Sequence, residues 1–266
     1  MEHKYLYETH LHTKESSACA SCEGSRYPAY YKKQGYTAII VTDHFFNGNC
    51  AVPWELPWEE KVRRFCLGYE NAKEAGRNIG LDVFFGWEAN YCGAEFLIYG
   101  LEKEWLKAHP EIMDWSIQEQ FAYVQEAGGC VVQAHPFRER EYTARIQLYP
   151  EYVNAVEVQN SGNEPYQNTL AFLYAKRFGL PMTAGSDIHH ETIPNLGLMG
   201  VTFDKKIASS KEYAAFLKSG SGWQITPQVD RNQKEMLLVK HPIDCFSKRV
   251  KKAISLKELL RENSLS

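Results

Sequence analysis

The sequence predicts an α/β protein built on a mostly parallel sheet, which is either layered or closed into a barrel. Short apolar runs alternate with segments of helical character along most of the chain, and strands joined by crossover helices run parallel. The apolar runs are nearly continuous, which is typical of strands buried on both faces, as in a barrel. With 266 residues, the chain is long enough to form one such domain.

The predicted elements follow one another in regular order from the amino terminus. β-Branched and aromatic residues dominate the apolar runs, whereas the intervening segments repeat their apolar residues with a helical period. We expect strands at residues 5–8, 37–42, 81–86, 129–134, 154–159 and 180–185, and helices at Tyr27–Gln34, Glu59–Asn78, Ile117–Ala127 and Glu164–Arg177.

The last part of the chain breaks this alternation. It contains a polar loop at residues 228–235, an apolar run at 236–240 and a helical segment at 255–263. We therefore expect one domain over residues 1–266, with residues 223–266 as a C-terminal extension packed on it.

Charge and composition argue against several classes of function. The formal net charge of −3 provides no general positive field for nucleic acid or an anionic membrane. No apolar run is long enough to cross a bilayer and the start does not resemble a signal peptide, so we expect a cytoplasmic protein. Seven cysteines without regular spacing favour reduced thiols, and the CxxC of Cys19 and Cys22 is by itself a weak signal for a metal or redox site.

Residues able to bind a metal follow the apolar strands. In parallel α/β folds, ligands gather at the carboxyl ends of the strands, so residues distant in sequence are expected to meet on one rim. Within one extended segment, residues two apart point the same way and can bind the same ion. The residues in this pattern are His10, His12, Asp43, His44, Glu88, His135, Asp187 and His189. The histidines outside it are His3, His109, His190 and His241.

The ordered motifs HxH, TDH, GWEAN, AHP and GSDxH resemble those of the PHP (polymerase and histidinol phosphatase) family across roughly residues 5–200. Each motif alone is weak, but the ordered set is specific. The resemblance implies a distorted seven-stranded (β/α) barrel, similar to a TIM barrel, and metal-dependent phosphoesterase chemistry. It also implies two or three divalent metal ions, for which zinc, manganese and iron all suit mixed histidine and carboxylate ligands.

The resemblance further implies a role for each motif residue. The first ion would be surrounded by His10, His12, Glu88 and Asp187. A second ion, bridged to the first by Glu88, would also be bound by His135. A third would be bound by His44 and His189. Asp43 would orient a metal-bound imidazole from behind, as such imidazoles usually require.

The chain departs from the family pattern at two places. Many members carry a histidine or aspartate shortly after HxHT, where this chain reads KESSACASCEG and offers Glu15 as the nearest candidate. A histidine often follows in the strand after the bridging glutamate, where this chain has Glu95 in EFLIYG. Glu95 is therefore either an ordinary surface glutamate or a ligand of the ion shared by Glu88 and His135, since a buried unpaired carboxylate would cost several kcal/mol.

The predicted reaction is hydrolysis of a small phosphate monoester such as histidinol phosphate, a nucleotide or a sugar phosphate. Bound divalent ions lower the pKa of water to roughly 7, and the metal-activated hydroxide would attack phosphorus. Glu88 and Asp187 are thus the candidate catalytic residues. Arg138 is either a third one, which clamps a phosphate oxygen with its planar fork, or a surface arginine paired with Glu139 or Glu141.

Three other functions stay open at this point. A 3′–5′ exonuclease or oligonucleotide phosphodiesterase would use the same ions, with nucleic acid only as substrate. An amidohydrolase also begins with HxH on a barrel strand, but commonly bridges its ions with a modified lysine, where this chain has Glu88. A non-catalytic module is the third.

The aromatic residues of the loop at 45–60, which either cover the substrate or cap the barrel, are Phe45, Phe46, Trp54 and Trp58.

Overall fold

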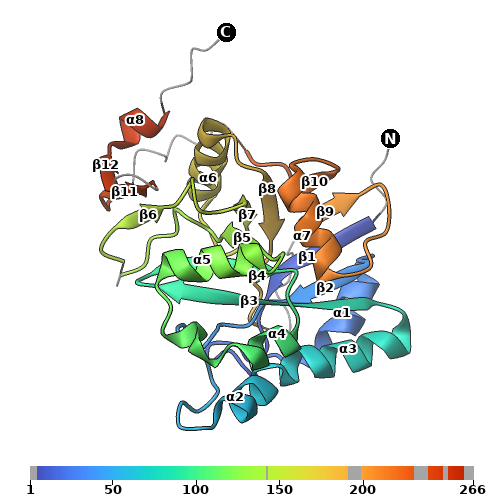
Figure 1. The fold of residues 1–266 in the computed structure, drawn as a ribbon. Coiled ribbons are helices and arrows are strands. Elements are labelled where there is room, and N and C mark those ends of the chain that lie inside the picture. Colours follow the sequence, from blue (N-terminus) through green and yellow to red (C-terminus); the bar gives the residue numbers. More distant parts are fainter. Residues whose placement is uncertain (1–4, 142, 191–198, 231–238, 248–250, 261–266) are drawn as a thin grey trace.

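The computed structural model describes residues 5–141, 143–190, 199–230, 239–247 and 251–260, and these form a mixed α/β fold (Figure 1). The main sheet has nine strands in the order β10-β9-β1-β2-β3-β4-β5-β7-β8. Its strands are β1 Tyr5–Leu11, β2 Ala38–Val41, β3 Asp82–Tyr91, β4 Ala94–Tyr99, β5 Cys130–Gln133, β7 Ala155–Asn160, β8 Met182–Gly185, β9 Gly200–Phe203 and β10 Trp223–Thr226.

Strand β1 brings the two halves of the main sheet together into a nearly closed barrel. Its first half pairs antiparallel with β9, whereas its end is bonded to the segment that follows β8. The backbone N–H of Asp187 donates to the carbonyl of His10 at 2.7 Å, and that of His12 donates to the carbonyl of Ile188 at 2.9 Å. The barrel therefore closes at the carboxyl ends of β1 and β8, where the sequence places its metal ligands.

The predicted α/β barrel class is confirmed, but the strands number nine instead of seven and are not all parallel. Strand β4 runs antiparallel to both β3 and β5, because only Cys92 and Gly93 connect it to β3. Both residues have positive φ angles, 51° and 89°, as a two-residue hairpin of type I′ requires. Strand β9 pairs antiparallel with β1, and β10 in turn pairs antiparallel with β9.

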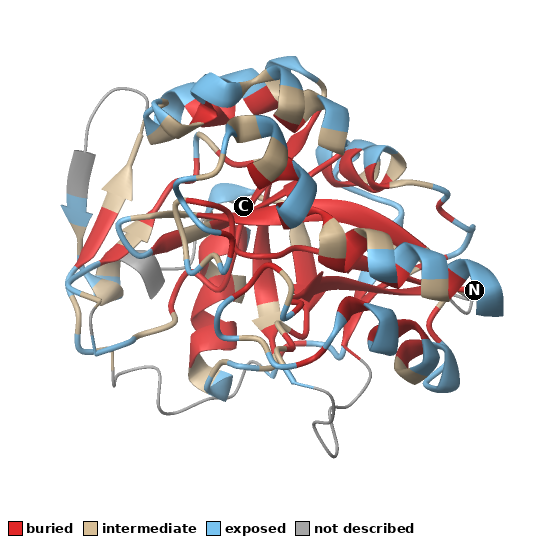
Figure 2. Ribbon diagram, turned by 90° about the horizontal axis from the view of Figure 1, so that it is seen from below, coloured by how far each residue is buried: buried red, intermediate tan, exposed pale blue. Residues whose placement is uncertain are grey.

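Helices cover the outside of the sheet, and Figure 2 shows buried strands in the middle with exposed helix faces around them. The single helix predicted at Glu59–Asn78 is in fact two helices, since Cys66 ends one and begins the next. Helix α3 then stops at Gly80, whose left-handed conformation suits glycine. The helices are α1 Tyr27–Lys33, α2 Trp58–Phe65, α3 Leu67–Ile79, α4 Lys103–Ala108, α5 Ile117–Glu126, α6 Pro165–Phe178, α7 Ser210–Ser219 and α8 Leu256–Leu260, with 3-10 turns η1 Gly24–Arg26 and η2 Pro110–Met113.

Alternate side chains of one strand enter two different cores, which explains the continuous apolar runs. In β2, Ile39 and Val41 belong to the core that includes Tyr31 of α1. Ala38 and Ile40 belong to the second core, together with side chains of α6 and α7. Because both faces of the strand are buried, neither face carries polar residues.

The C-terminal segments form part of a second sheet with the order β12-β11-β6. Its strands are β6 Ile146–Leu148, β11 Ile243–Phe246 and β12 Lys251–Ile254. The strand predicted at 236–240 falls largely outside the described residues, and residues 239 and 240 are not in a strand. The helix predicted at 255–263 is the shorter α8. Among the described helices, none combines the length and apolarity needed to cross a membrane.

Candidate metal centre

The strand ends bring the predicted metal ligands into one buried group. We call this group, defined by the residues listed next, the histidine–carboxylate cluster. It consists of His10, His12, His44, Glu88, Glu95, His135, Asp187 and His189, whose ligand atoms form overlapping sets that lie within 4.8 Å of one another. Asp187 and His135 turn their side chains inward through left-handed backbone conformations, with φ angles of 56° and 24°.

Glu88 lies at the centre of the cluster. Its Oε1 is 3.3 Å from His10 Nε2 and 3.2 Å from His135 Nε2. Its Oε2 is 3.6 Å from His12 Nε2 and 2.8 Å from His44 Nδ1. A carboxylate that offers each oxygen to a different pair of imidazoles has the geometry expected of a bridge between two ions.

Asp187 completes the inner part of the cluster. Its Oδ1 is 3.1 Å from His12 Nε2 and 3.4 Å from His10 Nε2, and these two imidazole nitrogens are 3.0 Å apart. Two carboxylates and two imidazoles thus surround one small volume, which matches the ligand set implied for the first ion.

Three imidazoles have a hydrogen-bond acceptor at Nδ1 and turn Nε2 toward the cluster. His10 Nδ1 donates to the Glu157 carboxylate at 2.9 Å, and His189 Nδ1 donates to the Asp187 carbonyl at 2.8 Å. His12 Nδ1 is 3.2 Å from Ser17 Oγ. Because Ser17 donates its own proton to Asp43, its oxygen must accept the hydrogen bond from His12 Nδ1. Since these partners only accept, Nδ1 carries a proton, and Nε2 is the ring nitrogen that would bind an ion after losing any proton of its own.

Glu157 is a functional residue that the sequence reasoning missed. It lies on β7 and is fully buried, and besides His10 it accepts from the backbone N–H of His135 at 3.1 Å. Glycine at position 185 leaves room for this arrangement, because a Cβ there would lie 2.4 Å from His10 Cβ and 3.0 Å from Glu157 Oε1. A carboxylate inside the apolar run NAVEVQ was the available signal, since buried carboxylates need partners.

Asp43 and Glu15 differ from the sequence expectations. Asp43 accepts from the backbone N–H of Thr13 at 2.6 Å and from Ser17 at 2.7 Å, so it orients His12 only through Ser17. Glu15 lies outside the cluster: its carboxylate accepts from Gly24 N–H at 3.1 Å and from Asn71 Nδ2 at 2.9 Å. The interpretation of Glu15 as a ligand is thus not supported, because its loop turns that side chain toward η1 and α3.

Glu95 faces the cluster instead of the outer surface. Its Oε2 is 3.5 Å from His135 Nε2, its Oε1 accepts from Asn90 Nδ2 at 2.9 Å, and its side chain is 20% exposed. Burial raises the pKa of the Glu95 carboxyl, and the nearby Glu88 charge adds to this effect. The position fits a ligand of the ion proposed to lie between Glu88 and His135.

Electrostatics keep the inner carboxylates negative. Burial disfavours their charge, but the neighbouring His10 holds the pKa of both Glu88 and Asp187 well below the usual range, with Arg138 assisting at Asp187. The pKa of His12 is well below its usual value, first because of burial and then because His44 lies beside it. Anionic carboxylates next to a neutral imidazole form a donor set suited to a divalent cation.

Two buried atoms show directly that the residues fit a metal. Glu88 Oε2 and His44 Nδ1 have no hydrogen-bond partner among the described residues. They lie 2.8 Å apart, yet their contact lacks the alignment of a hydrogen bond. Because a buried carboxylate oxygen without a partner is costly, a bound cation is the natural way to satisfy it.

Arg138 is buried against the cluster and does not lie on the surface. Its guanidinium donates to Asp187, to Asn160 Oδ1 and, at 2.8 Å, to Asn163 Oδ1. Its side chain is 7% exposed, and the group lines the cavity above the cluster. Arg138 can therefore fix Asp187 from one side and offer its charge to a ligand from the other.

A cavity of about 710 Å³ opens above the cluster. Polar groups surround it, among them Asn47, Asn90, Arg140 and His190. Cys19 also lines it: burial opposes ionisation of this thiol, but hydrogen bonds with His189 and His44 prevail and lower its pKa to about 6.

The aromatic residues of the 45–60 loop do not line this cavity. Phe45 and Phe46 are buried in the core against Phe65 of α2. Trp54 is 59% exposed, and its ring packs against Lys61 Nζ, which lies 3.7 Å from the ring centroid. Of the two expected roles for these rings, the structure favours capping of the barrel.

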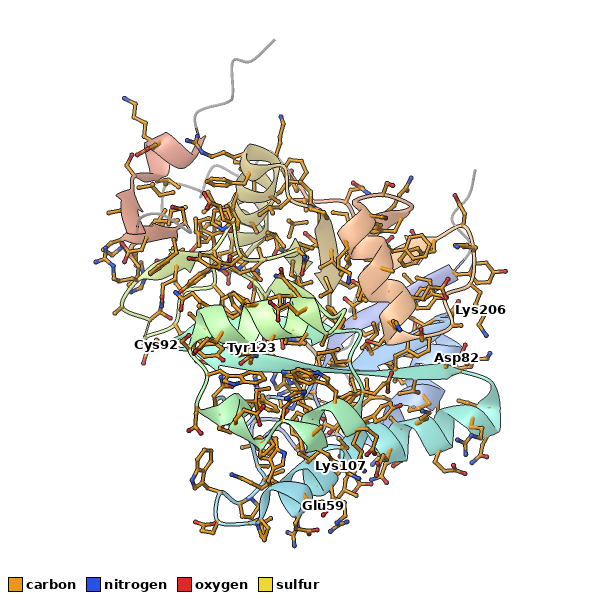
Figure 3. The ribbon with its side chains drawn as sticks, viewed as in Figure 1. Glu59, Asp82, Cys92, Lys107, Tyr123 and Lys206 are labelled. Carbon is orange, nitrogen blue, oxygen red and sulfur yellow. The ribbon has the colours of Figure 1, made fainter. Side chains whose placement is uncertain are left out.

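The other end of β3 lacks such a cluster. Figure 3 labels both ends of this long strand, with Cys92 in the turn beyond the site and Asp82 beside Lys206 at the start, where their charged atoms are 2.7 Å apart. A cavity of about 270 Å³ at that start is lined by Lys73 and Arg77, with no histidine among its lining residues. Among the residues that the structure describes, the candidate metal ligands thus lie at one end of the barrel.

Comparison with known structures defines the class of fold. The chain is similar to a two-domain protein from Bacteroides vulgatus containing a predicted PHP-like metal-dependent phosphoesterase, with 14% identity, a TM-score of 0.64 and coverage of 83% of this chain. It spans 64% of that protein. It also resembles a protein from Bifidobacterium adolescentis assigned as a metal-dependent phosphoesterase, with 19% identity, a TM-score of 0.51 and coverage of 73% of this chain and 91% of the other.

A third similar structure is the lesion-specific endonuclease Q from Pyrococcus furiosus, with 11% identity, a TM-score of 0.53 and coverage of 82% of this chain and 57% of the other. The chain therefore has the fold of PHP-like metal-dependent phosphoesterases. In sequence, the PHP-associated family model matches residues 165–221, which agrees with the predicted resemblance to the PHP family. No curated protein shows significant sequence similarity to the chain.

Proposed function

We propose that this protein is a metal-dependent hydrolase of small phosphate monoesters. One observation carries the proposal: Glu88, with a buried oxygen that lacks a hydrogen-bond partner, is surrounded by four imidazoles at the base of an open cavity. When bound, two or three zinc, manganese or iron ions would supply Lewis acidity and lower the pKa of water enough for attack on phosphorus.

Residues of the chain would have distinct roles in binding the ions and the substrate. Glu88 would bridge two ions, while Asp187 would bind the inner one and be held in place by Arg138. Glu157 would fix the ring of His10 so that its Nε2 faces the ion. The guanidinium of Arg138 would also bind a phosphate oxygen, since a planar fork matches phosphate geometry.

The shape and lining of the cavity support a small substrate. Its volume of about 710 Å³ falls within the range of small-molecule sites. Neutral amides and imidazoles line it together with only two arginines, Arg138 and Arg140, so a continuous basic track for a nucleic acid backbone is lacking among the described lining residues. The described residues that line the cavity include no lysine, which argues against the lysine-bridged centre of an amidohydrolase.

A second candidate is an endonuclease or exonuclease, with nucleic acid as the substrate. The similarity to endonuclease Q favours it, because one structure of that enzyme holds a 27-mer duplex with an abasic lesion at the active site. The same ligand cluster would suit a phosphodiester, and the two candidates differ in the part of the substrate beyond the reacting phosphate.

Comparative kinetics test the proposal. Protein of measured metal content would be assayed on p-nitrophenyl phosphate, its bis ester and a short oligonucleotide, and then on a panel of phosphorylated metabolites. We expect the monoester to be hydrolysed fastest, with Glu88→Gln as the inactive control. Preference for the bis ester and oligonucleotide would favour the nuclease, and no hydrolysis with any metal would contradict both candidates.

A further inference from the structure

Cys19 lies in the loop after β1, and backbone hydrogen bonds on both sides hold this loop against the cluster. The N–H of Ala18 donates to the carbonyl of Asn49 at 2.9 Å, and the N–H of Ser21 donates to the carbonyl of His189 at 2.8 Å. Asn49 belongs to the loop that begins at His44. The backbone around Cys19 is therefore fixed between the two segments that carry the outer histidines of the cluster.

The thiol of Cys19 contacts both of these histidines. Burial opposes the change, but the neighbouring thiol helps to raise the pKa of both His44 and His189, and all three groups line the same cavity. The ring of His12 lies beside them, with centroid distances of 4.2 Å to His44 and 4.3 Å to His189. A sulfur atom and three imidazoles thus meet on the solvent side of the cluster.

We propose that Cys19 is a thiolate ligand of the ion bound by His44 and His189, which makes this outer position a sulfur-containing metal site. The proposal rests on the proposed metal-dependent function and specifies one of its ions. On binding, the sulfur forms a bond to the ion and releases its proton to solvent.

The donor set gives the outer position its own metal preference. Zinc and other thiophilic ions accept cysteine together with histidine, whereas harder ions such as manganese prefer oxygen ligands. The histidine–carboxylate cluster itself consists only of imidazoles and carboxylates. The outer position should therefore select zinc-like ions even where the two inner ion positions, beside Glu88, accept manganese.

Two details of the structure support Cys19 over its neighbours. His189 Nδ1 is bound to the Asp187 carbonyl, which leaves Nε2 for an ion, and Glu15 is engaged with Gly24 and Asn71. Cys22, the second cysteine of the CxxC, is 2% exposed and donates its thiol to the Glu23 carbonyl at 3.5 Å. The motif is therefore not a two-cysteine site, and Cys19 alone faces the cluster.

Absorption spectra of the cobalt-substituted protein test this ligand without any assay of hydrolysis. A thiolate bound to Co²⁺ gives a sulfur-to-cobalt charge-transfer band in the near ultraviolet, which imidazole and carboxylate ligands do not give. We expect the band in the wild-type protein, in Cys22→Ser and in Cys92→Ser, whose thiol is exposed but lies outside the cavity. Cys19→Ser should lose it, and its zinc content should fall by about one equivalent because a tetrahedral site loses a ligand.

The outcomes separate this proposal from the proposed function. A cobalt-loaded protein that hydrolyses phosphate esters without the band would overturn the Cys19 ligand and leave the phosphatase proposal intact. A band that persists in Cys19→Ser would also overturn it. Circular dichroism and thermal unfolding of each variant show whether the fold is retained. A Cys19→Ala variant that keeps the full zinc content of the wild-type protein would contradict the proposal independently of the cobalt spectra.

Discussion

Two buried glutamates, Glu8 on β1 and Glu88 on β3, are satisfied in opposite ways. Glu8 is 0% exposed and accepts four hydrogen bonds from fixed donors: the N–H groups of Thr9, His10 and Ser186, each at 2.9 Å, and the Tyr31 hydroxyl at 3.0 Å. Glu88 is 1% exposed and has only imidazoles around it, with Oε2 left without a hydrogen bond.

The difference distinguishes a structural carboxylate from a metal-binding one. Backbone and hydroxyl donors occupy both oxygens of Glu8, so this carboxyl needs no cation to satisfy them, although burial raises its pKa to about 7. Through these contacts Glu8 stabilises the joint between β1 and the segment after β8. The imidazoles around Glu88 leave its Oε2 without a hydrogen bond, so that oxygen still requires a proton or an ion. Burial alone, almost equal at the two residues, does not show which of them binds metal.

The largest effect is expected for Glu88→Gln. Loss of the bridging charge should release the two metal ions that Glu88 is proposed to bridge. Hydrolysis should then fall by roughly a thousandfold or more, since several kcal/mol of charge stabilisation are lost. His189→Ala should retain more activity because it affects only the outer ion. Steady-state rates with parallel elemental analysis measure both, and equal rates at saturating metal would contradict the bridging role.

Glu157→Gln should have the next largest effect. The change weakens the hydrogen bond that orients His10, and loss of such a partner typically costs 10–100-fold in metal affinity or activity. Competition with a chelator measures the affinity. Glu139→Gln is the matched control, since Glu139 binds His241 at 2.6 Å and is not a member of the cluster. Equal affinities in the two variants would show that Glu157 has no positioning role.

Glu8→Gln should change stability but not metal content. An amide keeps the shape but places an NH2 group where one carboxyl oxygen accepts a hydrogen bond, so the free energy of unfolding should fall by about 1–3 kcal/mol. Urea denaturation measures the change, and metal content should match that of the wild-type protein. Loss of metal without loss of stability would reverse the proposed distinction between the two glutamates.

The smallest effect is expected at the opposite end of β3. Lys73→Ala and Arg77→Ala remove positive charges from the cavity of about 270 Å³ at that end, which no proposed step uses. We expect the free energy of unfolding to change by less than about 0.5 kcal/mol, and kcat/KM to change by less than about twofold. A larger decrease in kcat/KM for phosphate esters would indicate a second anion site and weaken the contrast between the two ends.

The positions of the ligands on the strands could be predicted from the sequence, whereas the partners behind them could not. His10, His44, His135 and Asp187 lie at or just after strand ends, and parallel topology brings such residues together. Glu157 contacts His10 across 147 residues and Ser17 contacts Asp43 across 26, so the sequence does not show which residues these side chains meet. Glu157 also resembles an ordinary strand residue, because its burial depends on the closed barrel.

Two misassignments have local physical causes. Glu15 is the candidate nearest to HxHT in sequence, but Gly24 and Asn71 hold its carboxylate outside the cluster. The antiparallel strand β4 was within reach of the sequence, since Cys92-Gly93 between two apolar runs is a hairpin signal. The nine-strand count depended on β9 and β10, whose short sequences do not reveal which strand they join.

The closure of the barrel at β1 and β8 has a consequence for the order of folding. Thr9 Oγ1 donates to the carbonyl of Ala184 at 2.7 Å across a sequence separation of 175 residues, and the ligands His10 and Asp187 lie just beyond this contact. Such a joint forms slowly, because a long loop must close before any contact offsets its entropy. A chain emerging from the ribosome can complete the inner metal site only after β8 has been made, so the bound ion would link β1 to β8 as a late, stabilising crosslink.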